Sequence, residues 1–324
     1  MRIAIDAMGN DNGSQVFVDA IKMFLHDFND VNIVVYGKEE EFLCFKDQDN
    51  IEIIDCHQYI TMDDGLLAVK RKIDSSMSKI LTDLAENRID GVVSAGSTGA
   101  LLTLSIAKIK TISTIERPCL LATVPSTTDR VFQYLDMGAN SDTSAHNIHQ
   151  FALMGQIYSK IVFKVEHPHV RLLNIGTEKG KGDKLHKEAF ELLNNDDRLI
   201  FDGNIEGRDM FNGEADVIVT DGFSGNMTLK AIEGTAHFAF DQLKSAIYSS
   251  TLSKIAGLLL KKTLVQVKDK LDYSRYGGAV LIGLEKPVVK AHGSSNAKAI
   301  YNALIRLHVI IKNDTINILK RELQ

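Results

Sequence analysis

Residues 91–110 read GVVSAGSTGALLTLSIAKIK and hold a short apolar run, a glycine-rich turn and a longer apolar run, in that order. The first run, Gly91–Ser94, is typical of a strand that is buried on both faces of a sheet. The second run, Ala100–Lys110, has the length and spacing of a helix. A strand that passes through a tight turn into a helix is half of a βαβ unit, so this stretch predicts an α/β fold.

The same alternation continues along the chain and predicts a sheet covered by helices on both sides. Further strands are predicted at Arg2–Ala7, Asn32–Tyr36, Ile51–Asp55, Cys119–Val124, Phe132–Met137, Arg171–Ile175 and Val217–Thr220, and in KPVVK at 286–290. Further helices are predicted at Val16–Phe28, Asp74–Asn87, His146–Lys160, Asp183–Leu193, Asn226–Lys244 and Ser295–Lys312, the second capped by Asp74 or Ser75. No Pro-, Ser- or Gly-rich linker divides the chain. We expect one domain over residues 1–324, either undivided or built of two intertwined lobes.

The composition is that of a cytoplasmic globular protein. The chain has 324 residues, of which 44% are hydrophobic, and its 42 acidic and 37 basic residues give a net charge of −5. This balance disfavours a general nucleic-acid binder. The three cysteines, Cys44, Cys56 and Cys119, include no C-x-x-C pair, so we expect reduced thiols. The N-terminal apolar stretch is too short for a signal peptide, and no run of about 18 apolar residues predicts a membrane span.

Residues 249–270, SSTLSKIAGLLLKKTLVQVKDK, have a different character. Leu252, Ile255 and Leu259 fall on one helical stripe. Five lysines add positive charge: Lys254, Lys261, Lys262, Lys268 and Lys270. Such a helix could lie on an anionic membrane or meet an acidic partner. An apolar stripe is also typical of a core or dimer-interface helix, and both interpretations stay open.

Three strand–turn–helix junctions are rich in small and polar residues, and in such folds ligands bind beyond the carboxyl ends of strands. The first junction supplies the candidate substrate-binding residues Ser94, Gly96, Ser97, Thr98 and Gly99. Glycines let backbone N–H groups converge on an anion, hydroxyls add donors, and the helix N-terminus adds positive potential. An ordinary capped turn is the alternative.

The second junction is DGFSGN at 221–226, where Asp221 ends a strand and Asn226 and Lys230 lie in the helix that follows. Strand ends are common places for a catalytic or positioning carboxylate. The third junction is KAHGSSN at 290–296, with His292, Ser294, Ser295 and Asn296 before another helix. A histidine there could donate to phosphate oxygens or move a proton near neutral pH. Turns that only cap their helices are again the alternative.

Two other loops give weaker signals, and several familiar motifs are missing. Residues 135–140, LDMGAN, hold an acid and an amide, and residues 176–182, GTEKGKG, hold Lys179 and Lys181, which a solvated turn also explains. The chain lacks the G-x-G-x-x-G, G-x-x-x-x-G-K-[ST] and G-x-S-x-G motifs. His146 and His149 have no third ligand of metal type nearby in the sequence. We therefore expect neither a metal nor a cofactor.

Eight blocks, in this order, resemble the bacterial phosphate acyltransferases. They are RIAIDAMGNDNG (2–13), VVSAGSTGALL (92–102), LDMGAN (135–140), QFALMG (150–155), LLNIGTEKGKGD (172–183), GNIEGRDMFNGEADVIVTDGFSGN (203–226), RYGGAVLIG (275–283) and VVKAHGSSNAKAI (288–300). Asn10 and Ser97 stand where the family usually has glycine and asparagine. The resemblance implies a reversible reaction in which phosphate attacks an acyl thioester on acyl carrier protein and gives acyl phosphate for phospholipid synthesis.

The resemblance also implies a three-layer α/β/α fold with a mixed, largely parallel sheet, like that of isocitrate and isopropylmalate dehydrogenases. It further implies a homodimer that associates peripherally with the inner face of the membrane, where a glycerol-3-phosphate acyltransferase uses the product. More distantly, ADVIVTDGFSGNMTLK (215–230) and KPVVKAHGSSN (286–296) are similar to segments of phosphotransacetylases.

Residue roles follow from these junctions and the implied reaction. The 94–99 loop with Ser294, Ser295 and Asn296 is expected to hold phosphate, and His292 or Lys230 to offset its charge. Asn226 or backbone N–H groups are expected to polarise the thioester carbonyl, and Asp221 to orient the lysine or histidine. Basic residues are expected to receive the acidic carrier protein: Arg71, Lys72, Lys179, Lys181, Lys184 and the lysines of 254–270.

Two alternatives compete with this function. A metal-dependent hydroxy-acid dehydrogenase on the same fold would need clustered acids, usually at i and i+4 of one helix, but Gly225 stands four residues after Asp221. A catalytically inactive scaffold for membrane lipid enzymes could keep the same loops. Formation of acyl phosphate would separate the proposed enzyme from both.

Overall fold

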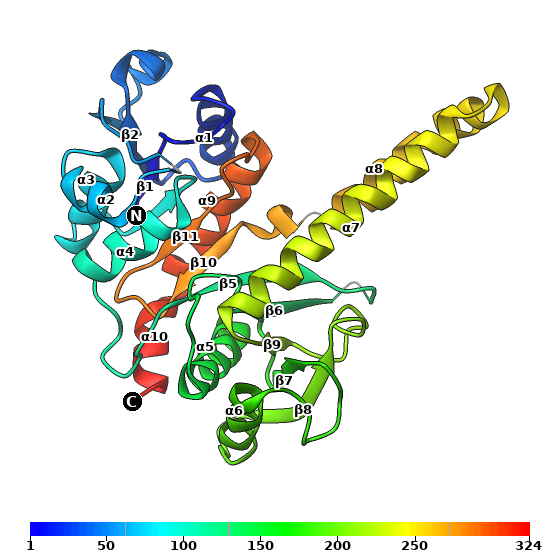
Figure 1. The fold of residues 1–324 in the computed structure, drawn as a ribbon. Coiled ribbons are helices and arrows are strands. Elements are labelled where there is room, and N and C mark those ends of the chain that lie inside the picture. Colours follow the sequence, from blue (N-terminus) through cyan, green and yellow to red (C-terminus); the bar gives the residue numbers. More distant parts are fainter. Residues whose placement is uncertain (62, 129, 272) are drawn as a thin grey trace.

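Eleven strands form one sheet in the computed structural model (Figure 1), which describes residues 1–61, 63–128, 130–271 and 273–324; the side chains of residues 66 and 268–274 lie outside this description. The strands are β1 (Arg2–Asp6), β2 (Asn32–Gly37), β3 (Ile51–Asp55), β4 (Gly91–Ser94), β5 (Cys119–Pro125), β6 (Val131–Leu135), β7 (His169–Asn174), β8 (Ile200–Glu206), β9 (Val217–Val219), β10 (Ala279–Ile282) and β11 (Val288–Lys290). Their order across the sheet is β3-β2-β1-β4-β11-β10-β5-β6-β9-β7-β8.

The sheet contains two parallel groups that run in opposite directions. Strands β3, β2, β1, β4 and β11 are parallel to one another, and so are β6, β9, β7 and β8. Between the groups, β10 and β5 make antiparallel pairs with each other and with the flanking strands. The predicted α/β fold with a mixed, largely parallel sheet is therefore confirmed, and the change of direction lies in the middle of the sheet.

Helices cover the sheet on both faces. They are α1 (Gln15–Asp27), α2 (Leu66–Arg71), α3 (Ser76–Ala85), α4 (Thr98–Lys108), α5 (Ala145–Phe163), α6 (Lys184–Asn194), α7 (Gly222–Tyr248), α8 (Thr251–Leu271), α9 (Ala297–Lys312) and α10 (Thr315–Glu322). Side chains of α1, α5, α6, α9 and α10 share one core with one face of the sheet. Side chains of α2, α3 and α4 form a second core on the opposite face of the first strand group.

Alternation along β1 shows how the sheet joins these two cores. Ile3 and Ile5 belong to the first core, whereas Ala4, between them, belongs to the second, and all three are fully buried. Successive side chains of a strand point to opposite faces, so a strand that is covered twice must be apolar at every position. Burying each isoleucine contributes roughly 1.5–3 kcal/mol. This is why short, continuous apolar runs predicted the strands.

Several predicted elements have different ends in the structure, and some were not predicted. Helix α3 starts after Ser75, whose Oγ accepts the Ser78 N–H at 3.3 Å, so the serine and not Asp74 is the cap. The helix predicted at Asn226–Lys244 begins at Gly222 instead, because Asp221 accepts the first free N–H group. The prediction missed β8, β10, α2 and α10. In β8, the polar residues of IFDGNIE hide the strand pattern.

Helices α7 and α8 form a hairpin that projects from the rest of the protein (Figure 1). At Gly257 an added Cβ would lie 2.3 Å from Ile247 Cγ2, so the absence of a side chain lets the helices pack together. Large apolar side chains stay exposed along the hairpin: Phe238, Leu243, Tyr248, Leu252, Ile255, Leu258, Leu259, Leu260 and Val265. The alternative of a core helix at 249–270 is therefore wrong for the single chain.

The α7–α8 hairpin also contains the segment that was expected to lie on a membrane. Among the helices that the structure describes, none has the length and apolarity that a membrane-crossing segment needs. Lys254, Lys261 and Lys262 are on described parts of α8, whereas the side chains of Lys268 and Lys270 lie outside the described residues.

Candidate active site

A cavity of about 220 Å³ lies at the middle of the sheet, where the strand direction changes. It is lined by Thr98, Leu120, Met137, Gly138, Asn226, Leu229, Lys230, Gly278, Ala279, Lys290, Ala291, His292, Ser295 and Ala299. Each of the three predicted junctions contributes at least one of these residues. A switch point in an α/β sheet is a general location for ligand binding, so this cavity is the candidate active site.

The first junction reaches the cavity through Thr98, the first residue of α4. The Ser94 hydroxyl instead donates to Asp6 Oδ2 at 2.8 Å and accepts the Gly96 N–H at 3.2 Å, inside the protein. An added Cβ at Gly96 would lie 2.6 Å from Met77 Cε, so the loop packs too tightly for a side chain. Ser97 is the N-cap position of α4. Free N–H groups at this helix start favour a bound anion.

The second junction places Asn226 and Lys230 in the cavity by close backbone packing. An added Cβ at Gly225 would lie 1.9 Å from the Asp136 carbonyl oxygen, and one at Gly222 would lie 2.1 Å from the Asn140 carbonyl oxygen. The first turn of α7 is thus pressed against the loop at 136–140. On the other side of this contact, an added Cβ at Gly138 would lie 2.9 Å from Asn226 Cβ.

The Asp136 carboxylate holds the 136–140 loop in shape. It is fully buried and accepts the N–H groups of Leu120 at 3.1 Å, of Ala139 at 2.9 Å and of Asn140 at 2.9 Å. Burial raises the pKa of Asp136, and these hydrogen bonds act in the opposite direction. This acid of the LDMGAN block therefore supports the cavity lining at Gly138 without facing the cavity itself.

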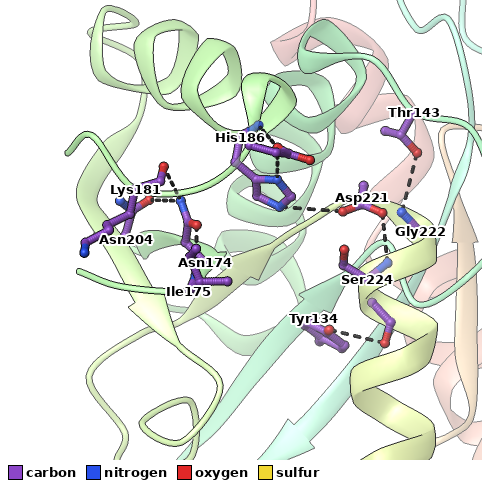
Figure 2. A network of polar contacts seen from close by, with 12 residues as sticks. Tyr134, Thr143, Asn174, Ile175, Lys181, His186, Asn204, Asp221, Gly222 and Ser224 are labelled. Carbon is purple, nitrogen blue, oxygen red and sulfur yellow. Dashed lines mark hydrogen bonds and ion pairs between the residues drawn. The ribbon is translucent and has the colours of Figure 1, made fainter. Parts of the chain in front are cut away.

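Asp221 is not in the cavity lining, and it contacts His186 and the start of α7 (Figure 2). Its Oδ1 accepts the Ser224 N–H at 2.8 Å, and its Oδ2 lies 3.6 Å from His186 Nε2. Lys230 Nζ lies 2.7 Å from Glu233 Oε2. The expected contact of Asp221 with the lysine or with His292 is thus replaced by a helix cap.

The third junction presents His292 as a hydrogen-bond donor. Its Nδ1 lies 2.8 Å from Ser294 Oγ and accepts the Ser294 N–H at 3.2 Å, which leaves the proton of a neutral ring on Nε2. Burial, followed by the charges of Lys290 and Lys230, lowers the pKa of His292. The ring is therefore neutral at pH 7 and can donate a hydrogen bond without adding positive charge. A lysine is the better candidate for the expected role of offsetting the phosphate charge.

The three polar residues that follow His292 in this junction have different contacts. Ser295 is buried and lines the cavity, whereas Ser294 is exposed and contacts the imidazole. The Asn296 Oδ1 accepts the Ala299 N–H at 3.0 Å and caps α9. The loop after β1 fixes this junction, since Asn12 Nδ2 donates to the Ser294 carbonyl at 2.9 Å.

Lys181 lies in a second polar cluster, outside the cavity lining (Figure 2). Its carbonyl accepts from Asn174 Nδ2 at 3.2 Å, and its half-exposed Nζ lies 3.9 Å from Glu178 Oε1. Gly99 also lies outside the lining, and an added Cβ there would meet nothing within 4 Å. Gly99 thus follows the lining residue Thr98 in α4 without lining the cavity itself, and Lys181 belongs to the cluster around Asn174.

Lys290 and Asp6 were not assigned a role from the sequence. Lys290 ends β11, is only 8% exposed and lines the cavity; Asp6 ends β1 and is 1% exposed. Both residues follow apolar strand residues in the sequence. An ionisable side chain at a strand position that is expected to be buried was the signal that could have identified them.

A second hollow of about 670 Å³ opens beside α2 and is lined by Gly65, Leu67, Ala68, Arg71 and Lys72. The segment before it packs on the first junction, because an added Cβ at Gly9 would lie 3.6 Å from the Ile60 carbonyl oxygen and 3.7 Å from Gly96 Cα. Helix α2, which ends at Arg71, also packs against α4, whose first residue Thr98 lines the candidate site.

Comparison with known proteins places these features in a family. A family model described as "Fatty acid synthesis protein" matches residues 1–317. A protein of Streptococcus mutans named phosphate acyltransferase is 44% identical over 324 residues, which cover 99% of this chain and 98% of the relative. Another of that name, from Staphylococcus aureus, is 43% identical over 321 residues, which cover 99% of this chain and 97% of the relative.

Solved structures support the fold at a greater distance. A phosphotransacetylase from Streptococcus pyogenes has a TM-score of 0.61 at 21% identity, with 98% of this chain and 94% of that chain covered. The likeness to isocitrate and isopropylmalate dehydrogenases stays a prediction. The match over nearly the whole length shows that this chain belongs to the fatty acid synthesis protein family, together with relatives named phosphate acyltransferase.

Proposed function

We propose that this protein transfers a fatty acyl group reversibly from acyl carrier protein to inorganic phosphate, and that the reaction takes place in the cavity at the middle of the sheet. The observation that carries the proposal is the charge of the cavity. Its described lining holds two lysines and a histidine, and no aspartate or glutamate. Such a lining attracts a phosphate dianion, and the relatives named phosphate acyltransferase point to the same substrate.

Phosphate is seated, in this proposal, by donors from the first and third junctions. The start of α4 at Thr98 supplies free backbone N–H groups and a hydroxyl. The buried Ser295 hydroxyl and the Nε2–H of neutral His292 supply further donors. Holding a nucleophile in line with its target can supply roughly 7–11 kcal/mol of the barrier reduction.

The chemical step is a direct displacement. A phosphate oxygen attacks the thioester carbonyl, the new C–O bond forms and the C–S bond breaks, and the proton of hydrogen phosphate passes to the leaving sulfur to give the thiol. Asn226, which also lines the cavity, is the residue we propose to donate to the carbonyl oxygen as it gains negative charge. One donor of this kind lowers the barrier by about 3–4 kcal/mol.

The acidic carrier protein needs a basic surface close to the cavity. Arg71 and Lys72 line the open hollow beside α2, near the loop that contains Thr98. Lys72 Nζ lies 2.5 Å from Asp64 Oδ2, so Arg71 has the less neutralised charge of the two. We propose this hollow as the docking place, with Lys179, Lys181 and Lys184 as a more distant second candidate.

The projecting hairpin of α7 and α8 is the candidate surface for the homodimer and for peripheral membrane contact. Its exposed apolar side chains, such as Leu258 at 72% and Leu259 at 81% exposed, are hard to explain for an isolated chain in water. Lys261 and Lys262 on α8 would suit an anionic membrane surface. A membrane glycerol-3-phosphate acyltransferase that uses the acyl phosphate would then be close by.

The decisive experiment is a phosphate-dependent assay of the purified protein with acyl-acyl-carrier-protein. We expect acyl phosphate, trapped with hydroxylamine, and free carrier thiol to appear in equal amounts. Formation of neither product would reject the proposal and favour the inactive scaffold. NAD-dependent oxidation of a hydroxy acid would favour the dehydrogenase, although Asp221, the acid such an enzyme would use, faces His186.

A further inference from the structure

Three polar residues form a row across neighbouring strands beneath the first junction. Asp6 of β1 pairs in register with Ser94 of β4, and Ser94 pairs in register with Lys290 of β11. Because the three strands are parallel, side chains at the same level point to the same face of the sheet. All three side chains are buried, and Lys290 at the end of the row lines the cavity.

The Lys290 ammonium is poorly neutralised for such a buried group. Its Nζ lies 3.5 Å from the Ala95 carbonyl oxygen and also contacts the Ala291 carbonyl oxygen. Within the described ranges of the chain, no carboxylate oxygen lies within the 4.0 Å of an ion pair with this Nζ. These two carbonyl groups accept from the ammonium but leave its positive charge in a buried site, which is unfavourable unless an anion joins it.

The other two basic groups of the cavity are less suited to bind an anion by charge. Lys230 has a half-exposed side chain whose Nζ lies 2.7 Å from Glu233 Oε2, so a carboxylate already offsets its charge. His292 is neutral at pH 7, as its lowered pKa shows. Lys290 therefore supplies the least compensated positive charge that faces the cavity.

Asp6 keeps this charge available. Burial raises the pKa of Asp6, whereas hydrogen bonds, including that from the Ser94 hydroxyl at 2.8 Å, and the charge of Lys290 act to lower it and so favour the carboxylate beside this ammonium. Burial lowers the pKa of Lys290 to about 8, while Asp6 and Asp11 act to raise it. His292 and Lys230 are the other titratable groups that share the cavity lining with Lys290.

We propose that Lys290 Nζ binds the phosphate substrate directly, and that Asp6, held by Ser94, is the positioning residue that keeps Lys290 protonated. This inference rests on the proposed function, because it names the phosphate-binding cation of the same site. It assigns to a buried lysine the charge-offsetting role that the sequence suggested for His292 or Lys230. A bound phosphate would place an anion beside the lysine of the cavity lining whose Nζ has no carboxylate within 4.0 Å in the described chain.

The proposal predicts a specific pH dependence. A lysine is charged below its pKa, so phosphate binding should be strong at pH 7 and weaken about tenfold for each pH unit above about pH 8. In Asp6→Asn the carboxylate charge is lost, so the pKa of Lys290 should fall and the weakening should begin at lower pH. If Asp6 had only a structural role, Asp6→Asn would reduce stability without changing the pH at which phosphate binding begins to weaken.

Calorimetric titration of the full-length protein with inorganic phosphate, alongside acyl-transfer kinetics, tests the proposal. Lys290→Met should raise the phosphate dissociation constant and KM roughly 10- to 100-fold at pH 7, and Lys290→Arg should recover part of the loss. Lys286→Met is a matched control, because this half-buried lysine contacts Asn87 outside the cavity lining. Its phosphate affinity should match that of the unaltered protein.

Unchanged phosphate affinity in a folded Lys290→Met protein would overturn the inference. If that variant does not fold, the unaltered protein and Asp6→Asn decide: phosphate affinity that stays constant from pH 7 to pH 9.5 in both would overturn it. Lys290-dependent phosphate binding without acyl phosphate formation would reject the proposed function and leave the phosphate site standing. Acyl transfer that persists with a normal phosphate KM in Lys290→Met would reject Lys290 as the phosphate-binding residue and leave the proposed function standing.

Discussion

A methyl group at Gly225 tests whether close packing at the start of α7 positions Asn226. The new Cβ would lie 1.9 Å from the Asp136 carbonyl oxygen and 3.1 Å from Thr220 Cγ2. To reach an ordinary C···O contact of about 3.3 Å, helix and loop must separate by about 1.4 Å. Such overpacking costs about 1–3 kcal/mol, and removing a helical glycine returns at most about 1 kcal/mol. With the full gain subtracted, Gly225→Ala should lower the unfolding free energy by up to about 2 kcal/mol.

The same separation should slow acyl transfer more than it destabilises the fold, because Asn226 moves with the helix. A displacement of about 1 Å at a reacting group can reduce the rate up to roughly 100-fold. Gly234→Ala is the matched control, since an added Cβ there meets nothing within 4 Å. It should stabilise α7 by about 0.5–1 kcal/mol and leave turnover intact. Urea unfolding and the acyl phosphate assay measure both effects, and identical behaviour of the two variants would refute the packing argument.

Three further changes test other parts of the molecule. Replacing His292 and Ser295 together with alanine should raise the phosphate KM at least about tenfold, whereas an unchanged KM would move the phosphate site elsewhere. Leu258→Asp should release the protein from vesicles of anionic lipid without altering thermal unfolding, because the side chain is 72% exposed; unchanged flotation would argue against membrane contact by the hairpin. Asp196→Asn should lower the unfolding free energy by about 1–2 kcal/mol at pH 7, because the contact with Arg198 holds the pKa of this acid below its usual 3.8. An acid with a lowered pKa stabilises the fold above pH 3.8, and this stabilisation is lost as the pH falls. A stability difference between Asp196→Asn and the unaltered protein that persists at low pH would therefore contradict the role given to the Arg198 contact.

The strands that could be predicted are those whose environment is uniform. Strands β1 and β4 are covered on both faces, so their burial shows in the local sequence as a continuous apolar run. Strand β10 is as buried, but its four residues lie next to Gly278 and Gly283, and the run looks like a loop. Its antiparallel direction depends on pairing with β5, which is distant in the chain. No local pattern carries that information.

The location of the site could be predicted better than the direction of its side chains. Glycine- and serine-rich junctions identified three segments that the structure brings to one cavity. The sequence does not show that the Ser94 hydroxyl turns inward to Asp6, or that Asp221 turns to the start of its own helix and His186. The Ser94–Asp6 and Asp221–His186 contacts join residues that lie far apart in the chain, whereas the cap of α7 by Asp221 is a local contact that the capped-turn alternative already allowed. Lys290 was overlooked for the related reason that its burial depends on neighbouring strands.

The distribution of acids around the cavity bears on how the reaction can proceed. Asp6, Asp136 and Asp221 each accept from hydroxyl or N–H donors, and none belongs to the described lining of the cavity. A carboxylate that faced the phosphate would repel it, and a general base is unnecessary because phosphate is already an anion near pH 7. The neutral His292 likewise donates a hydrogen bond and takes no proton at the start. In the proposed mechanism, a site arranged in this way accelerates the reaction by binding and orienting phosphate, and the proton that the thiolate needs arrives with the nucleophile.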